Sequence, residues 1–333
     1  MTKDLLDLDA TPERLQALAA AGVLPPQVME RALELAVASP PRAWWRRFLS
    51  TTLMGLGALL VLSGVIYFFA FNWAALHRFG KFGLLMAAIA AAALTAWHLG
   101  ERTSGQFALL FAAVLVGPLL AVYGQAYQTG ADPYELFLGW GALILPWVIL
   151  ARFGPLWLFE LVLANTAAIL FWDQVLDDAN PTALQLTLAA LNGAAWIAHE
   201  LLSYRQVSWL QGRWLPRILA VMALFPLMIA TEKLAIDLEV EHGPLQVLCT
   251  ALLCGTLAGM YAFHRRVRSE LFFLTLGAAC VLTLVTTLVG HAVFDIMPDV
   301  MAFLFMPLVL IGEIGLVVLW LRHEARSRGT EDT

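Results

Sequence analysis

Residues 134–172, YELFLGWGALILPWVILARFGPLWLFELVLANTAAILFW, decide the fold class of this chain. Two apolar runs, near 134–151 and 155–172, flank the short turn Arg152-Phe153-Gly154-Pro155. A helix that crosses about 30 Å of hydrocarbon needs about 20 mainly apolar residues. The stretch therefore predicts two transmembrane helices that run in opposite directions and are joined by a tight turn.

The rest of the chain extends this pattern. Of its 333 residues, 60% are hydrophobic and 14% charged, and the mean hydropathy is +0.76, whereas soluble domains average about 45–50% apolar and about 25% charged residues. Further apolar windows lie near 50–71, 79–99, 106–127, 183–202, 214–236, 245–264, 270–291 and 301–321. We expect an all-α, polytopic transmembrane bundle of about ten helices, and a bundle of eight or nine is the main alternative.

The first 40 residues differ from the rest. Thr11 and Pro12 favour a helix start, Gly22 a helix end, and Pro25-Pro26 the start of a second helix that reaches Ser39. Apolar residues recur along both at helical spacing, so the pair could pack on the membrane, on the bundle or on a partner. We expect a cytoplasmic helical hairpin over 1–40, a transmembrane domain over 41–325 and a polar tail over 326–333.

The Lys and Arg residues predict the orientation of the chain. Cytoplasmic loops of membrane proteins are enriched in these residues. With the N-terminus inside and ten spans, all but three of the 20 Lys and Arg residues fall on the cytoplasmic side, and the exceptions are Arg78, Lys81 and Lys233. A missed span would reverse every later loop. The charges therefore favour ten helices with both termini in the cytoplasm.

Several short motifs in the first half carry a family resemblance. They are GVIYFFAFNW at 64–73, GQAYQTGADP at 124–133, LGW at 138–140 and Leu145-Pro146. Together they resemble the bacterial membrane-protein family called domain of unknown function 2157, over about residues 10–155. The resemblance implies a multi-pass protein of the bacterial inner membrane. It carries over no catalytic residues, because none are established for the family.

Two carboxylates lie inside predicted spans, Glu160 and Glu313. An ionisable group in hydrocarbon costs about 2.5–3.5 kcal/mol on insertion scales and is a candidate for function. Both residues are about 12–14 Å from the predicted cytoplasmic edge, at about 1.5 Å per residue. If their helices touch, the pair could share a proton, as proton-coupled transport requires. The alternative is a carboxyl that bonds a neighbouring helix or reaches toward the interface.

The predicted sixth span carries a polar stripe. Gln185, Asn192, His199 and Gln206 follow one another at seven-residue steps, which drift only about 20° per step around a helix. The stripe could line a water-filled path, with His199 at its cytoplasmic end. Asn and Gln also form hydrogen bonds between membrane helices, and the same alternative applies to Asn165 in the fifth span.

A second group of polar and aromatic residues lies at the predicted outer ends of the first and third spans. These residues could form an outer vestibule that binds a ligand, although Tyr and Trp favour any membrane interface. The predicted outer loops are also acidic, which would concentrate cations or simply reflect the exclusion of Lys and Arg. The vestibule residues are Asn72, Trp73, Tyr123, Gln125, Tyr127, Gln128 and Asp132.

The sequence favours binding over catalysis. It contains no Walker loop, nucleophile elbow, His-Glu-x-x-His or dinucleotide motif, and its net charge of −5 argues against nucleic acid. We expect no metal or cofactor site. The leading hypothesis is a protein that binds or moves a small or lipidic solute. The alternatives are an envelope or assembly protein that docks another membrane protein or a second copy, and an intramembrane enzyme whose site would lie at Tyr123–Asp132.

Overall fold

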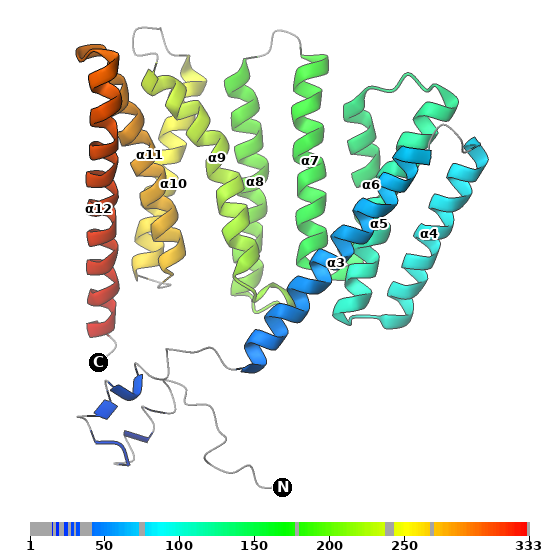
Figure 1. Cartoon of the computed structure of the whole chain (residues 1–333), viewed down its shortest axis with the longest axis horizontal. Helices are drawn as coiled ribbons and strands as arrows, with labels where there is room; N and C mark the ends of the chain where they lie inside the picture. The colour runs from blue at the N-terminus through cyan, green and yellow to red at the C-terminus, as the bar shows by residue number, and fades with distance from the viewer. Residues whose placement is uncertain are drawn as a thin grey trace. The chain divides into compact units, whose positions relative to one another are not determined.

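The structure is all-helical, as expected (Figure 1). It is a computed structural model that describes residues 15, 18, 19, 23–25, 28, 29, 31–33, 42–72, 77–176, 180–236, 243–266 and 270–331. These residues contain no β-strand. The helices are α3 (Arg42–Asn72), α4 (Arg78–Leu99), α5 (Thr103–Tyr127), α6 (Pro133–Ala151), α7 (Gly154–Val175), α8 (Pro181–Tyr204), the 3-10 helix η2 (Ser208–Leu210), α9 (Trp214–Ile236), α10 (Pro244–Arg266), α11 (Leu271–Ile296) and α12 (Asp299–Glu331).

Eight helices in the described part of the chain are long and apolar enough to cross a membrane. They are α4, α5, α6, α7, α9, α10, α11 and α12. The windows near 50–71 and 183–202 are also helical, as α3 and α8, but neither is among the eight. Polar residues such as Gln185, Asn192 and His199 lower the hydropathy of α8, and several α3 side chains lie outside the described residues. The multi-pass architecture is confirmed, and the count of ten stays a prediction.

Local signals account for several helix boundaries. The expected tight turn is confirmed, because α6 ends at Ala151, Arg152 has a left-handed φ of 47°, and α7 begins at Gly154. The side chain of Asn180 accepts a 2.9 Å hydrogen bond from the Thr182 backbone N–H and so caps α8. Within the predicted hairpin, the described residues 15, 18, 19, 28, 29 and 31–33 are helical, 23–24 form a bend and 25 is in no element; the others lie outside the described residues.

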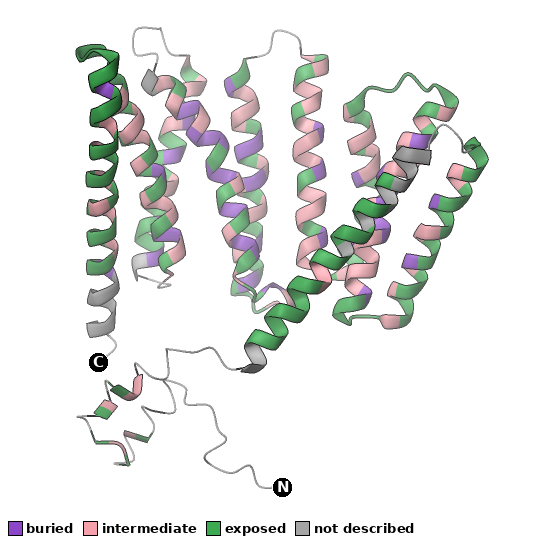
Figure 2. Cartoon of the chain, in the orientation of Figure 1, coloured by how far each residue is buried: buried purple, intermediate pink, exposed green. Residues whose placement is uncertain are grey.

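The chain divides into two compact units, residues 1–81 with 90–111 and residues 82–89 with 112–333. Helices α6 to α12 lie in the second unit, where α6 packs on α7, α7 on α8 and α8 on α9; α9 packs on α10 and α11, and α11 on α12. Figure 2 shows the buried residues concentrated on α9 and α8, whereas α12 is mostly exposed. The core of this unit therefore lies around α9, with Leu224, Leu253 and Phe273 among its most buried side chains.

The helices of the second unit alternate in direction. The α8–α9 connection and the start of α11 lie at the same end, because Arg213 contacts Glu270 across them. Figure 1 shows the C-terminal part of α12 at this end as well. Arg152, Arg205 and Arg213 all belong to connections at this end of the unit. This grouping agrees with the charge pattern from which the orientation was predicted.

Candidate functional site: a cavity between α5 and α6

A cavity of about 530 Å³ lies where α5 ends and α6 begins. Three of the predicted vestibule residues, Tyr123, Gln125 and Asp132, line it. Tyr127 and Gln128 belong to the same segment but do not line the cavity. The Asn72 side chain and the whole of Trp73 lie outside the described residues. The complete lining is Leu120, Ala121, Tyr123, Gly124, Gln125, Thr129, Gly130, Ala131, Asp132, Pro133, Glu135, Leu136, Phe137 and Gly139.

A fixed turn forms one wall of the cavity. Helix α5 ends at Tyr127, and Gln128 adopts a left-handed conformation with φ of 45°. The backbone N–H of Thr129 then donates to the carbonyl of Gly124 over 3.3 Å, which is the six-to-one bond of a Schellman ending. Gly130 has φ of 65°, a value that glycine adopts without steric cost. These bonds and dihedrals direct the chain from α5 into Pro133, the first residue of α6.

Trp140 sets the spacing between α5 and α6 beside the cavity. Its indole N–H donates to the backbone carbonyl of Ala113 on α5 over 2.8 Å. The ring covers Gly117, where an added Cβ would lie 2.2 Å from an indole carbon. Ring contacts with Phe137 and Phe159, at 6.1 and 5.4 Å between centroids, hold the indole in place. The Trp140 ring therefore acts as a spacer between α5 and α6. Only glycine at position 117 leaves room for this ring against α5.

Helix α6 is in turn anchored on α7. The backbone N–H of Tyr134 donates to the side-chain oxygen of Gln174 over 3.3 Å, and the Tyr134 ring contacts Phe171 edge-on. Deeper in the same interface, Glu160 of α7 lies against the backbone of Gly141, where a Cβ would be 2.9 Å from its Oε1. Helix α6, which forms one wall of the cavity, is thus supported by contacts with α7 at both Tyr134 and Gly141.

The cavity lining combines an apolar floor with hydrogen-bond acceptors. Leu120, Leu136 and Phe137 provide apolar surface, whereas Asp132 and Glu135 provide carboxylates. The Asp132 side chain accepts no hydrogen bond from the first turn of α6, although the residue occupies the N-cap position. No Lys, Arg or His side chain is part of the lining. The lining can therefore accept hydrogen bonds from a ligand and complement a positive charge.

The predicted interior amides form a closed pair. Asn165 of α7 and Asn192 of α8 exchange two hydrogen bonds, of 2.9 and 2.8 Å. Each side-chain NH₂ group also donates to the backbone carbonyl four residues earlier, Leu161 or Leu188. Both donors of each amide are thereby used. Asn192 is only 2% exposed, and the pair joins α7 to α8 by direct hydrogen bonds, as amides between membrane helices do.

The other residues of the predicted stripe separate from this pair. Gln185 is half-buried, whereas Gln206 is exposed and lies beyond the end of α8 with φ of 62°. His199 is 5% exposed, and its Nδ1 has no hydrogen-bond partner among the described residues. Of the predicted stripe, Asn192 and His199 are therefore buried in the protein interior, whereas Gln206 is not.

The two intramembrane carboxylates are not brought together. Glu160 lies in the α6–α7 interface, and one of its oxygens is buried without a hydrogen-bond partner among the described residues. Glu313 of α12 accepts a 2.5 Å hydrogen bond from Thr286 of α11. Helices α8, α9 and α11 separate α7 from α12 in the order of packing. A proton shared directly between the two carboxylates has no geometric basis in this arrangement.

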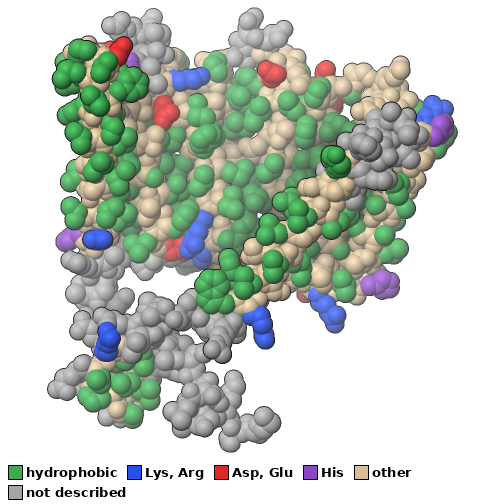
Figure 3. Space-filling view, in the orientation of Figure 1, with side chains coloured by type: hydrophobic (Ala, Val, Ile, Leu, Met, Phe, Trp, Pro, Cys, Tyr) green, Lys and Arg blue, Asp and Glu red, His purple; other side chains and the backbone are tan. Residues whose placement is uncertain are grey.

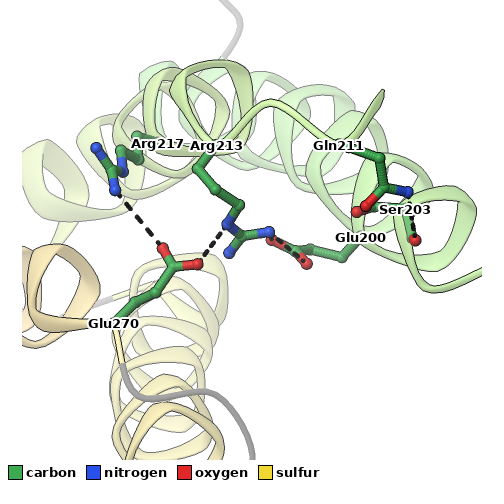
Figure 4. Close-up of polar contacts among 6 residues, drawn as sticks. All are labelled: Glu200, Ser203, Gln211, Arg213, Arg217 and Glu270. Carbon is green, nitrogen blue, oxygen red and sulfur yellow. Dashed lines mark hydrogen bonds and ion pairs between the residues drawn. The ribbon is translucent and has the colours of Figure 1, made fainter. Parts of the chain in front are cut away.

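Sequence reasoning missed an ion-pair network at the end of the unit that was predicted to be cytoplasmic (Figure 4). Arg213 lies between two carboxylates: its Nη1 is 3.3 Å from Glu200, and its Nε contacts Glu270. Arg217 lies 4.0 Å from the second oxygen of Glu270. Burial lowers the pKa of the Arg213 guanidinium, but the bonds to Glu270 and Glu200 offset this and raise the pKa above its ordinary value.

This network joins α8, α9 and α11. Arg213 and Arg217 also lie over the rings of Phe273 and Phe272, at 5.8 and 5.2 Å, and the Phe273 ring is stacked with the rings of His264 and Trp196. The presence of two acidic residues could have indicated this network in the sequence. Glu200 and Glu270 are acidic residues on a predicted cytoplasmic side that is otherwise rich in arginine.

Comparison with known proteins supports the assignment of the first half. No curated protein and no solved structure matches the chain significantly. A family model does match, and its range includes every residue of the α5–α6 cavity. The resemblance predicted over about residues 10–155 is therefore confirmed: residues 16–157 match the family described as "Predicted membrane protein (DUF2157)".

Proposed function

We propose that this multi-pass membrane protein binds the polar head of an amphipathic solute in the α5–α6 cavity, and that this head is a cationic hydrogen-bond donor. The cavity volume of about 530 Å³ falls in the range of about 300–1,000 Å³ that small-molecule sites occupy. The single observation that carries the proposal is the lining: two carboxylates above an apolar floor, with no basic side chain.

The position of the cavity suits an amphipathic ligand. It lies at the ends of α5 and α6, both of which are candidate membrane spans. Polar groups at a helix end lie near the headgroups, and the apolar floor continues toward the hydrocarbon. A head bound at Asp132 and Glu135 could therefore leave its chain against Leu120, Leu136 and Phe137.

The proposal concerns binding and not passage through the bundle. The sequence suggested a polar path along the sixth predicted span, and proton coupling through Glu160 and Glu313. Asn165 and Asn192 instead use their donors on each other and on their own helices. This arrangement supports a structural role for the interior amides.

We also propose that α3 and α8 cross the membrane, which gives ten spans, and that both termini lie in the cytoplasm of a bacterial inner membrane. The Lys and Arg distribution supports this orientation. The test is cysteine labelling with a membrane-impermeant maleimide in right-side-out vesicles, in a variant without the three native cysteines. Gly130→Cys should react from outside and Arg205→Cys only after permeabilisation. The reverse pattern would disprove the orientation.

A photoreactive amphiphile tests the binding site. The full chain is placed in phosphatidylcholine nanodiscs and irradiated with a diazirine-bearing dodecylamine or with the matching dodecanol. We expect adducts within residues 120–139 for the amine, and at least a fivefold loss of these adducts in Asp132→Asn/Glu135→Gln. The control is Asp173→Asn, which removes an exposed carboxylate on α7 outside the cavity. Equal labelling by the alcohol would refute a cationic head.

The second candidate function is that of an assembly protein that docks partner subunits through the N-terminal hairpin or the α5–α6 end. The tightly paired amides of α7 and α8 favour it, because they make that interface a solid support. Deletion of residues 1–40 should then abolish crosslinking to a partner in native membranes while the membrane domain still folds. Unchanged crosslinking would count against it.

A further inference from the structure

A second cavity, of about 590 Å³, lies in the other half of the second unit, between α10, α11 and α12. Helix α11 packs against both of its neighbours and forms the floor. Residues that line it include Tyr261, Phe273, Gly277, Val281, Glu313 and Trp320. All three helices are candidate membrane spans, and Figure 3 shows hydrophobic side chains over the surface of α12. This cavity therefore adjoins the hydrocarbon region of the bilayer.

Glu313 is the one acidic or basic side chain among the lining residues. Its Oε2 accepts a hydrogen bond from the hydroxyl of Thr286. Other threonines of α11, Thr275, Thr283 and Thr287, donate instead to the carbonyl four residues earlier on their own helix. The Thr286 hydroxyl thus bonds across the interface and holds the Glu313 carboxyl in position at the cavity.

A carboxylate inside a membrane span is normally paired with a cation or with strong donors. The cavity lining supplies no Lys, Arg or His for Glu313, and a single hydroxyl does not neutralise a negative charge. The remaining surface of the cavity is almost wholly aliphatic and aromatic. The occupant that complements this lining has one positive charge and a bulky apolar body.

We infer that the α10–α11–α12 cavity is a binding site for a lipophilic amine, whose ammonium group pairs with Glu313 while its apolar body packs on α11. Tyr261 and Trp320, with ring centroids 6.2 Å apart, line the cavity at its end nearer the predicted cytoplasmic face. Trp320 is seven residues from Glu313, or roughly 10 Å along α12 at about 1.5 Å per residue. This inference is independent of the α5–α6 cavity, with which it shares no residue.

The test uses the same diazirine-bearing dodecylamine and dodecanol, with adducts mapped by mass spectrometry on the full chain in phosphatidylcholine nanodiscs. We expect amine adducts within 257–285 and 313–320, and at least a fivefold loss of them in Glu313→Gln. Adducts within 120–139 should not change in that variant. The matched control is Asp299→Asn, which removes an exposed carboxylate from the start of the same helix, outside the cavity.

If Glu313→Gln does not fold, Thr286→Val provides a second test of the role of the Glu313 carboxyl. It removes the hydroxyl that bonds Glu313 but leaves the carboxyl in the cavity, so the amine adducts should persist or increase. Amine and alcohol adducts in equal amounts within 257–320 would overturn the inference, because they would mark an apolar groove without charge selectivity. Absence of amine adducts there in the unmodified chain would overturn it as well.

Discussion

The α7–α8 interface and the α5–α6 cavity both contain polar side chains, but the surroundings of these side chains differ. Between α7 and α8, Asn165 and Asn192 use all their amide donors within the protein. Between α5 and α6, a tryptophan spacer leaves room, and carboxylates line the resulting cavity. The two regions differ in how their polar side chains are used: the amides bond each other across the helix interface, whereas the carboxylates face a cavity.

The largest expected effect concerns the spacer itself. Gly117→Ala places a methyl group about where the Trp140 ring lies, since an ideal Cβ would be 2.2 Å from it. We expect a loss of about 3 kcal/mol in the free energy of unfolding, because overpacking of this severity forces the helices apart. Equilibrium unfolding in mixed dodecyl maltoside and sodium dodecyl sulfate micelles measures it.

The matched control for this prediction is Gly139→Ala. Gly139 is on α6 next to Trp140, and an added Cβ would meet nothing within 4 Å. Its unfolding midpoint should stay at or slightly above that of the unmodified chain, because alanine favours a helix by about 1 kcal/mol over glycine. Equal destabilisation by the two variants would show that Trp140 does not set the spacing.

The amide pair offers the next largest effect. Asn192→Leu leaves the half-buried amide of Asn165 without its partner on α8, and we expect a loss of about 2 kcal/mol in unfolding free energy. Asn165→Leu/Asn192→Leu should recover part of this loss, because no unpaired amide remains. A double-mutant cycle in the same micelles gives the coupling energy. Gln185→Leu, on the same helix, serves as the control, and a coupling near zero would restore the hypothesis of a hydrated path.

The ion-pair network should contribute less, because its members are partly exposed. We expect Arg213→Gln to cost about 1 kcal/mol, and the difference from the unmodified chain should shrink as salt is added. Arg205→Gln removes an exposed charge at the end of α8 and should have no measurable effect. A salt-independent loss in Arg213→Gln would assign the effect to packing on Phe273 instead of charge.

The smallest effect on stability is expected at the cavity. Asp132→Asn/Glu135→Gln should change the unfolding free energy by less than about 0.5 kcal/mol, as surface substitutions usually do, while amine photolabelling falls at least fivefold. This combination would separate a binding residue from a structural one. A stability loss comparable to that of Asn192→Leu would show that the cavity carboxylates have a structural role, like the amide pair between α7 and α8.

The sequence predicted well where the helices lie along the chain, but it predicted poorly which faces of neighbouring helices contact each other. Run lengths and the Arg152–Pro155 turn were sufficient for the helices α6 and α7, because burial in lipid requires a continuous apolar segment. Helix ends and a family-like motif also predicted that Tyr123, Gln125 and Asp132 would lie together. Tyr127 and Gln128 belong to the same motif but do not line the cavity: the Tyr127 ring contacts Tyr123 and Phe82, and the chain turns at the left-handed Gln128.

Pairings between helices needed the structure. Hydropathy does not specify how α7 and α8 rotate about their own axes, so Asn165 and Asn192 could equally have faced water or each other. The matched depths of Glu160 and Glu313 suggested a shared site, but depth alone carries no information about which helices are neighbours. Arg213 and Glu270 belong to separate connections, and only tertiary packing brings them together.

The positions of the network residues along the chain suggest an expectation for the order in which the helices assemble. Glu200 is made before Arg213, whereas Glu270 follows Arg213 by 57 residues (270 − 213). At about 5–20 residues per second, that interval lasts roughly 3 to 11 s. During this time Arg213 has only Glu200 as an acidic partner from the network, and α11 completes the set when it enters. We therefore expect the α8–α9 hairpin to form first, with the Arg213–Glu200 pair, and α11 to add Glu270 when it packs against this hairpin.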